Sequence, residues 1–168
     1  EVGAGWGFTS SNVTHGLVTA DLDGDGDLDL VASCLNAAPL VYRNETSAPR
    51  VAVRLKGRLP NAHGIGAKVR LLGGAVPSQQ REVQAGGHYL SGADPLQVFA
   101  AGASQSMTLE VTWRNGTRSV VHGVRPNRLY EIDEAGAQPA PERVSIPPRQ
   151  PLFGDVSDRL DHVHTEEN

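Results

Sequence analysis

Apolar and polar residues alternate in short stretches along most of the chain, and Gly, Asn, Asp and Pro separate these stretches. Alternation with a period of two places side chains on opposite faces of a strand, whereas a surface helix needs apolar residues three and four positions apart. No stretch sustains the helical spacing, so the pattern predicts a mainly β fold. The expected strands cover residues 17–20, 28–33, 40–43, 51–56, 67–72, 80–84, 96–99, 107–113, 117–122 and 128–132.

The strand expected at residues 107–113 is followed by a strong turn signal. Residues 115–116 are Asn-Gly, and both residue types tolerate the positive φ angles that a two-residue type I′ turn requires. The pattern therefore predicts a tight hairpin with the next strand. In that register Arg118 would lie across from Trp113 and could place its guanidinium group on the indole ring.

Two breaks divide the chain. The first falls near residues 47–49, Ser-Ala-Pro, and the second contains five prolines, which deny backbone donors to a sheet and favour an extended linker. We therefore expect four parts. They are an N-terminal unit at residues 1–47, a β domain at 48–134, a proline-rich linker at 135–151 and a polar tail at 152–168.

Composition excludes several classes of function. The chain has 15 Lys and Arg against 19 Asp and Glu and contains no basic cluster, so nothing predicts nucleic-acid binding. No apolar run approaches the ~18 residues that a membrane-spanning helix needs. Cys34 is the single cysteine, which excludes an internal disulfide. Because the chain begins with Glu1 and its one methionine is Met107, we expect it to be a piece of a longer protein.

An acidic segment carries the most chemical information. Its five aspartates occupy alternate positions: Asp21, Asp23, Asp25, Asp27 and Asp29. Their charges repel one another, and Arg43 is the only basic residue nearby in the sequence. Calcium takes six to eight oxygen ligands and is bound by loops of this composition. We expect Ca²⁺ to be held by the side chains of all but Asp27, which would contribute its backbone carbonyl and point its carboxylate to solvent.

The acidic segment has two alternatives to a calcium loop. An EF-hand loop begins with the same spacing, but it needs a bidentate acid at its twelfth position, which here is Ala32. The flanking residues 17–20 and 30–33 also favour strands over the two helices of an EF-hand. The other alternative is a solvated acidic turn that binds no metal. We therefore predict a calcium loop that joins two strands of a hairpin.

Residues 17–30, together with Leu-Val-Tyr-Arg-Asn at 40–44, resemble a repeat of the FG-GAP or VCBS type. In that family each repeat supplies one blade of a β-propeller and one calcium loop. The resemblance covers about residues 3–46 and implies that they form a blade at the end of a calcium-binding propeller. A single blade cannot bury both of its faces, so further blades are expected elsewhere in a longer chain. The tail segment 152–157 resembles another propeller strand.

Four further motifs narrow the resemblance. Residues 61–70, 80–83, 86–91 and 111–116 are similar, in order and spacing, to the ASPIC/UnbV domain. That domain follows FG-GAP repeats in the cartilage acidic protein-like family and in bacterial secreted proteins. The resemblance covers roughly residues 50–132 and implies a small antiparallel β-sandwich or barrel-like domain.

Histidine and aromatic residues leave two other possibilities open. One is a glycan-binding or hydrolytic site formed by His63, His88, Tyr89 and Trp113. A Ser-His pair alone makes no triad, and no nucleophile elbow surrounds Ser91. The other is a zinc site in the tail, where residues 162–166 contain two histidines and a glutamate within reach of one strand face.

The predicted function combines these observations. We expect a non-catalytic, calcium-stabilised interaction or adhesion module that is secreted, periplasmic or at the cell surface. Its expected partners are an extracellular protein or glycan and the remaining propeller blades of a longer chain, with no nucleic acid and no membrane span. The alternative is a carbohydrate-binding or hydrolytic accessory domain of a secreted enzyme.

Overall fold

A computed structural model describes residues 2–141, 154 and 159 of the chain. Within them the fold is mainly β, as predicted, and helical structure is limited to two 3-10 turns, η1 (Ala4–Trp6) and η2 (Glu134–Gly136). Every expected strand has a counterpart. The strands are β1 (Thr14–Ala20), β2 (Asp29–Cys34), β3 (Leu40–Tyr42), β4 (Arg50–Lys56), β5 (Lys68–Leu72), β6 (Ser78–Glu82), β7 (Gly87–His88), β8 (Ser91–Gly92), β9 (Gln97–Ala100), β10 (Met107–Thr112), β11 (Arg118–Val124) and β12 (Arg128–Asp133).

Seven of these strands form a β-sandwich. One sheet has the order β11-β10-β5-β6 and the other the order β12-β4-β9. Alternate residues of each strand point inward, as the period-two pattern requires, and they form one apolar core. Its members with no exposed surface include Val51, Val53, Val69, Leu71 and Leu109. Burying each such side chain contributes about 1.5–3 kcal/mol, so this core is the main source of stability.

The central strand β4 departs from the predicted all-antiparallel pattern. It pairs antiparallel with β9 but parallel with β12. Val51, Ala52 and Val53 are all buried, so β4 also departs from the expected alternation of one buried and one exposed face. The reason is that its outer face is covered as well: a Cβ atom added at Gly26 would lie 3.8 Å from the Cβ of Ala52. The segment that covers β4 is therefore the acidic loop.

The hairpin between β10 and β11 exists, but the predicted two-residue turn is wrong. Trp113 N–H donates to the carbonyl of Thr117 at 2.9 Å, and Gly116 N–H donates to the carbonyl of Trp113 at 2.9 Å. The loop therefore has three residues. Gly116 has a φ of 85°, whereas Asn115 is not among the residues with positive φ. A three-residue loop, in which a type I turn is followed by one left-handed residue, is a common connection between hairpin strands, as the two-residue type I′ turn is.

The longer loop changes the register of the hairpin. Arg118 pairs with Thr112 and lies 3.1 Å from the carboxylate of Glu110, so the predicted stacking of Arg118 on Trp113 is wrong. Trp113 is 2% exposed, and its indole N–H donates to the hydroxyl of Ser119 at 2.9 Å. The tryptophan is a core residue whose one polar atom is satisfied.

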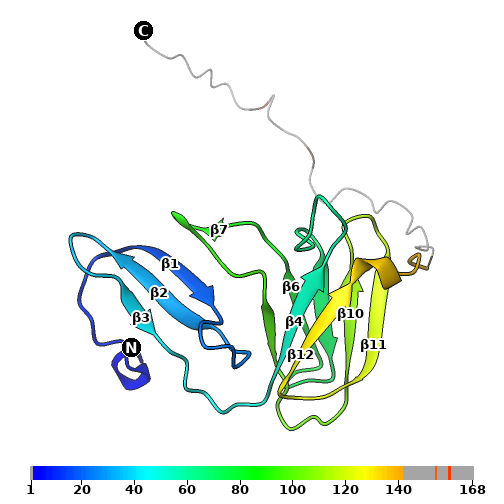
Figure 1. Cartoon of the computed structure of the whole chain (residues 1–168), viewed down its shortest axis with the longest axis horizontal. Helices are drawn as coiled ribbons and strands as arrows, with labels where there is room; N and C mark the ends of the chain where they lie inside the picture. Colours follow the sequence, from blue (N-terminus) through cyan, green and yellow to red (C-terminus); the bar gives the residue numbers. More distant parts are fainter. Residues whose placement is uncertain (1, 142–153, 155–158, 160–168) are drawn as a thin grey trace.

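A separate antiparallel sheet, β1-β2-β3, precedes the sandwich. Figure 1 shows this sheet beside the sandwich, with the β7-β8 arm extending from the sandwich toward β1. Ser91 Oγ of the arm donates to the carbonyl of Leu17 at 2.6 Å. Nearby, Asp94 N–H donates to the carbonyl of Thr19 at 3.1 Å. The arm thus supplies hydrogen-bond partners to the outer edge of β1.

The chain beyond β12 is described only in part. Backbone N–H groups of Arg118 and Gln138 each donate to the other's carbonyl, so Gln138 lies along the edge of β11. Most of the predicted linker and tail, residues 142–153, 155–158 and 160–168, lies outside the described residues, as does the possible zinc site at 162–166. Over the described positions, no helix has both the length and the apolarity that crossing a membrane requires.

One side chain closes the sandwich where its sheets meet. The amide of Gln79, on β6, donates from Nε2 to the carbonyl of Ala100 at 2.7 Å and accepts at Oε1 from the N–H of Ala100 at 3.0 Å. A side-chain amide thereby imitates the backbone pairing of a strand and joins the edge strands β6 and β9. Both hydrogen bonds depend on an amide, which has a donor and an acceptor.

We expect Gln79→Ala to lower the free energy of unfolding by about 1–2 kcal/mol, because it removes two hydrogen bonds and leaves Ala100 without partners from β6. Gln80→Ala on the same strand is the control, since the Gln80 side chain is exposed and points to the other face. Urea unfolding monitored by the fluorescence of the buried Trp113 measures both. Equal effects of the two substitutions would contradict this role of Gln79.

Candidate metal centre

The acidic loop connects β1 to β2, and strands flank it on both sides, as predicted. The two helices of an EF-hand are not present there. Gly24 and Gly26 have φ angles of 79° and 87°, a conformation that favours glycine, and they turn the chain back on itself. Their N–H groups donate to the two carboxylate oxygens of Asp21 at 2.8 and 3.1 Å. The loop is therefore folded around the carboxylate of its first aspartate.

Asp29 is the most firmly held acid of the loop. It is 1% exposed, and its two carboxylate oxygens accept hydrogen bonds from Leu22 N–H and Asn44 N–H, both at 2.8 Å. Asn44 follows β3, so Asp29 ties the loop to the far side of the sheet. These two hydrogen bonds fix the position of the Asp29 carboxylate at the base of the loop.

Three carboxylates converge in this loop. Asp21, Asp23 and Asp29 each present one oxygen, and these oxygens all lie within 4.8 Å of one another. Ligand oxygens of a calcium ion lie at about 2.3–2.6 Å from the metal, so two of them on opposite sides of one ion are separated by about 4.6–5.2 Å. The three aspartates therefore fit a hard cation in both donor chemistry and spacing.

The other two aspartates face an arginine. Asp25 accepts at Oδ1 from Asp27 N–H at 3.0 Å, and its Oδ2 lies 3.0 Å from Nη2 of Arg50. Asp27 is 2% exposed, so the prediction that its carboxylate points to solvent is wrong. The reason is that the loop packs against β4, and this packing removes the Asp27 carboxylate from water. Burial raises the pKa of the Asp27 carboxyl and the neighbouring Asp25 adds to this, while Arg50 opposes it.

Sequence reasoning missed Arg50. It considered Arg43, which lies 4.0 Å from Asp23 and forms a second ion pair with Glu45 on the surface. Arg50 is 21 positions beyond the last aspartate and belongs to the first strand of the sandwich. Its one sequence signal is its place directly after the break at residues 47–49. Only the packing of the loop on β4 brings the guanidinium to the acids.

The proposed hydrolytic or glycan residues are not assembled into one site. His88, Tyr89 and Ser91 line a cavity of about 180 Å³ beside β1, where His15 is a further neighbour. Trp113 is buried in the sandwich core, and neither it nor His63 lines this cavity. The four candidate residues of that alternative therefore lie in different parts of the structure.

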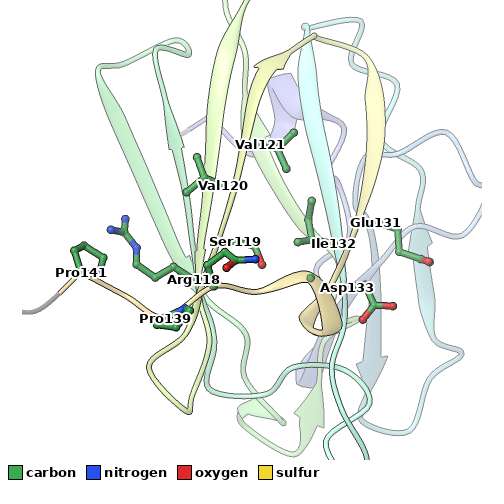
Figure 2. A pocket seen from close by; sticks show the side chains of 11 residues that line it. Arg118, Ser119, Val120, Val121, Glu131, Ile132, Asp133, Pro139 and Pro141 are labelled. Carbon is green, nitrogen blue, oxygen red and sulfur yellow. The ribbon is translucent and has the colours of Figure 1, made fainter.

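A groove of about 500 Å³ lies between β11 and β12. Figure 2 shows Val121 and Ile132 in its middle and Pro139 to one side. Ser119 is the hydroxyl residue in its lining, and this hydroxyl already accepts from Trp113. Among the described residues that line the groove none is a histidine or a cysteine.

Taken together, the fold defines an all-β chain in which a three-stranded sheet with an acidic loop is joined to a seven-stranded sandwich. Residues 57–139 match the family described as ASPIC and UnbV. The chain therefore carries an ASPIC/UnbV domain, as the resemblance implied, and this segment contains most of the sandwich.

Three curated relatives are all called cartilage acidic protein 1. The chain is 35% identical to the protein of Homo sapiens over 139 residues, which is 76% of this chain and 21% of that protein. It is 37% identical to the protein of Xenopus tropicalis over 117 residues, which is 66% of this chain and 18% of that protein. It is 36% identical to the protein of Mus musculus over 126 residues, which is 71% of this chain and 19% of that protein. The chain spans about a fifth of the length of these relatives.

The contribution of Asp27 to stability should fall as the pH rises. Because its pKa is raised above 3.8, the folded protein holds this proton more tightly than the unfolded chain does. The contribution is therefore fully present below that value and is lost as the pH rises through the folded-state pKa. Asp27→Asn should remove this dependence, so the variant should gain stability relative to the wild type with rising pH. Urea unfolding in EDTA, from about pH 3 to about pH 7, measures it.

Asp133→Asn is the control with the opposite sign. The pKa of Asp133 is lowered, because its carboxylate accepts from Ala135 N–H at 2.8 Å and lies 3.2 Å from the ammonium group of Lys56. Its stabilisation is present above 3.8 and is lost as the pH falls through the lower folded-state pKa. This variant should lose stability relative to the wild type with rising pH. These assignments would be contradicted if the stability of both variants, relative to the wild type, changed in the same direction with rising pH.

Proposed function

We propose that the chain is a non-catalytic, calcium-stabilised extracellular interaction module. Its residues 1–47 would be the FG-GAP-type blade at the end of a β-propeller, and residues 48–134 the ASPIC/UnbV β domain. Residues 135–151 would link this domain to the tail, residues 152–168. The proposed ligands in the loop are the side chains of Asp21, Asp23, Asp25 and Asp29 and the backbone carbonyl of Asp27, with Ca²⁺ as the metal.

The convergence of three carboxylate oxygens within 4.8 Å is the observation that carries this proposal. Three like charges at this separation destabilise the folded loop unless a cation or hydrogen bonds compensate them. When bound, calcium would supply two positive charges at this point. The aspartates would then hold the ends of β1 and β2 in one geometry, and the loop would order together with metal binding.

The first sheet has surface available for further blades. Trp6 and Phe8, from the segment before β1, and Tyr42 of β3 line a cavity of about 770 Å³, and Trp6 is 75% exposed. The ring centroids of Phe8 and Tyr42 are 4.9 Å apart in an edge-to-face arrangement. Exposed apolar surface of this kind is usual where a repeat packs against its neighbour. The much greater length of the relatives is compatible with such neighbours in a longer chain.

The extracellular setting has two supports. The name of the relatives refers to cartilage and to an acidic protein. Loops of extracellular modules bind calcium at roughly 10⁻⁴ to 10⁻³ M, which matches the abundant calcium outside cells. The partner we propose is an extracellular protein or glycan. A carbohydrate-binding or hydrolytic role has weaker support, because its candidate residues are separated in the structure.

Calcium should raise the thermal unfolding midpoint of the chain. With a dissociation constant of about 10⁻⁴ M, an excess of about 100-fold stabilises the folded state by about 2.7 kcal/mol, which corresponds to about 5–10 °C. Differential scanning calorimetry with calcium and with EDTA measures the shift. Asp21→Asn should abolish most of it, because it removes one ligand while keeping the side-chain shape.

Two controls separate this effect from general charge neutralisation. Asp133→Asn removes an acid outside the loop and should leave the calcium shift unchanged. An equal concentration of magnesium should shift the midpoint less, because Mg²⁺ demands a tighter octahedral site. An unchanged midpoint of the wild-type chain in millimolar calcium would refute the proposed metal. Turnover of ester or glycoside substrates would instead favour the enzyme alternative.

A further inference from the structure

Arg50 connects the acidic loop to the sandwich. It is the first residue of β4, and its side chain is 17% exposed. Nη2 donates to the backbone carbonyl of Asp25 at 2.8 Å and lies 3.0 Å from Oδ2 of the same residue. The same nitrogen lies 3.4 Å from Oδ2 of Asp27. One guanidinium group from the second unit thus contacts two of the five aspartates of the first.

The backbone of Arg50 is fixed on the sandwich side. Its N–H donates to the side-chain carbonyl of Asn127 at 3.2 Å, and its own carbonyl accepts from Asn127 N–H at 2.6 Å. Asn127 directly precedes β12, the parallel partner of β4. Because these contacts fix the backbone of Arg50 on the sandwich, its side chain reaches the loop from a fixed point.

Asp27 explains why the loop needs this cation. Its side chain is 3% exposed, and neither carboxylate oxygen has a hydrogen-bond partner among the described residues. The contact with Arg50 is therefore an ion pair without hydrogen-bond geometry. An isolated carboxylate removed from water is strongly destabilising, so Arg50 supplies the compensating charge.

Among the described residues, no ion pair joins Arg50 to the other three aspartates. One carboxylate oxygen each of Asp21, Asp23 and Asp29 lies within 4.8 Å of the other two, whereas Asp25 and Asp27 face the sandwich. Asp25 and Asp27 are therefore the two acids of the loop that Arg50 contacts. This separation was not apparent from the alternating aspartates of the sequence.

We propose that Arg50 docks the first sheet on the sandwich by recruiting Asp25 and Asp27 of the acidic loop. This docking role does not depend on the proposed calcium function. Arg50 is a positioning residue here.

The docking role is tested without metal by a double-mutant cycle in EDTA. Hydrogen exchange of the β1 and β2 amides measures how often the first sheet opens. Arg50→Met should raise the opening equilibrium constant about tenfold or more, because Asp27 is left buried without its cation. Adding Asp27→Asn should recover most of that loss, so the two substitutions should couple by about tenfold. Additive effects would overturn the proposal.

Arg54→Met is the matched control for charge loss on the same strand. Arg54 is 44% exposed and lies 3.9 Å from Asp94, so its removal should change the opening constant less than about threefold. Arg50→Lys keeps the charge but has fewer donors, and it provides an intermediate variant if Arg50→Met fails to fold. An effect of Arg50→Lys no larger than that of Arg54→Met would count against the proposed contacts.

Discussion

Repulsion among five aspartates within nine residues is the constraint on which the structure of the first sheet depends. Backbone N–H groups of the loop compensate part of it, since Asp21 and Asp29 each accept two such hydrogen bonds. Arg50 compensates another part from the sandwich. What remains is a cluster of three carboxylates, for which a hard cation is the natural counter-charge. The loop therefore links local folding, docking and the proposed metal in a single electrostatic balance.

The sandwich contributes Arg50 and the strand β4, against which the acidic loop packs. Its core holds β4 between β9 and β12, and the parallel partner β12 anchors the backbone of Arg50 through Asn127. The outer face of β4 carries Ala52, a small residue that lets the loop approach closely at Gly26. Contact between the two units thus combines this packing with the ion pairs of Arg50, and the β7-β8 arm adds hydrogen bonds to the edge of β1.

The match to the ASPIC and UnbV family covers the sandwich except for β4, because the matching segment begins just after β4 and ends at the residue after Gln138. Gln138 pairs with Arg118 at the edge of β11, so the match and the structure extend the folded part of the chain slightly beyond β12. The proposed interaction function depends on the first sheet, which the family match does not include. Its exposed aromatic residues and its acidic loop distinguish it from the sandwich, whose apolar residues are mostly buried.

The sequence by itself determined the mainly β class, the position of each main strand and the acidic loop between two strands. These features depend on local period-two patterning, turn residues and charge density, which a linear sequence displays directly. Tertiary structure alone decided the three-residue turn at Gly116, the parallel pairing of β4 with β12 and the burial of Asp27 against Arg50. Each of these follows from which faces pack together, and residues distant in the sequence choose their faces through the shared core rather than through local pattern.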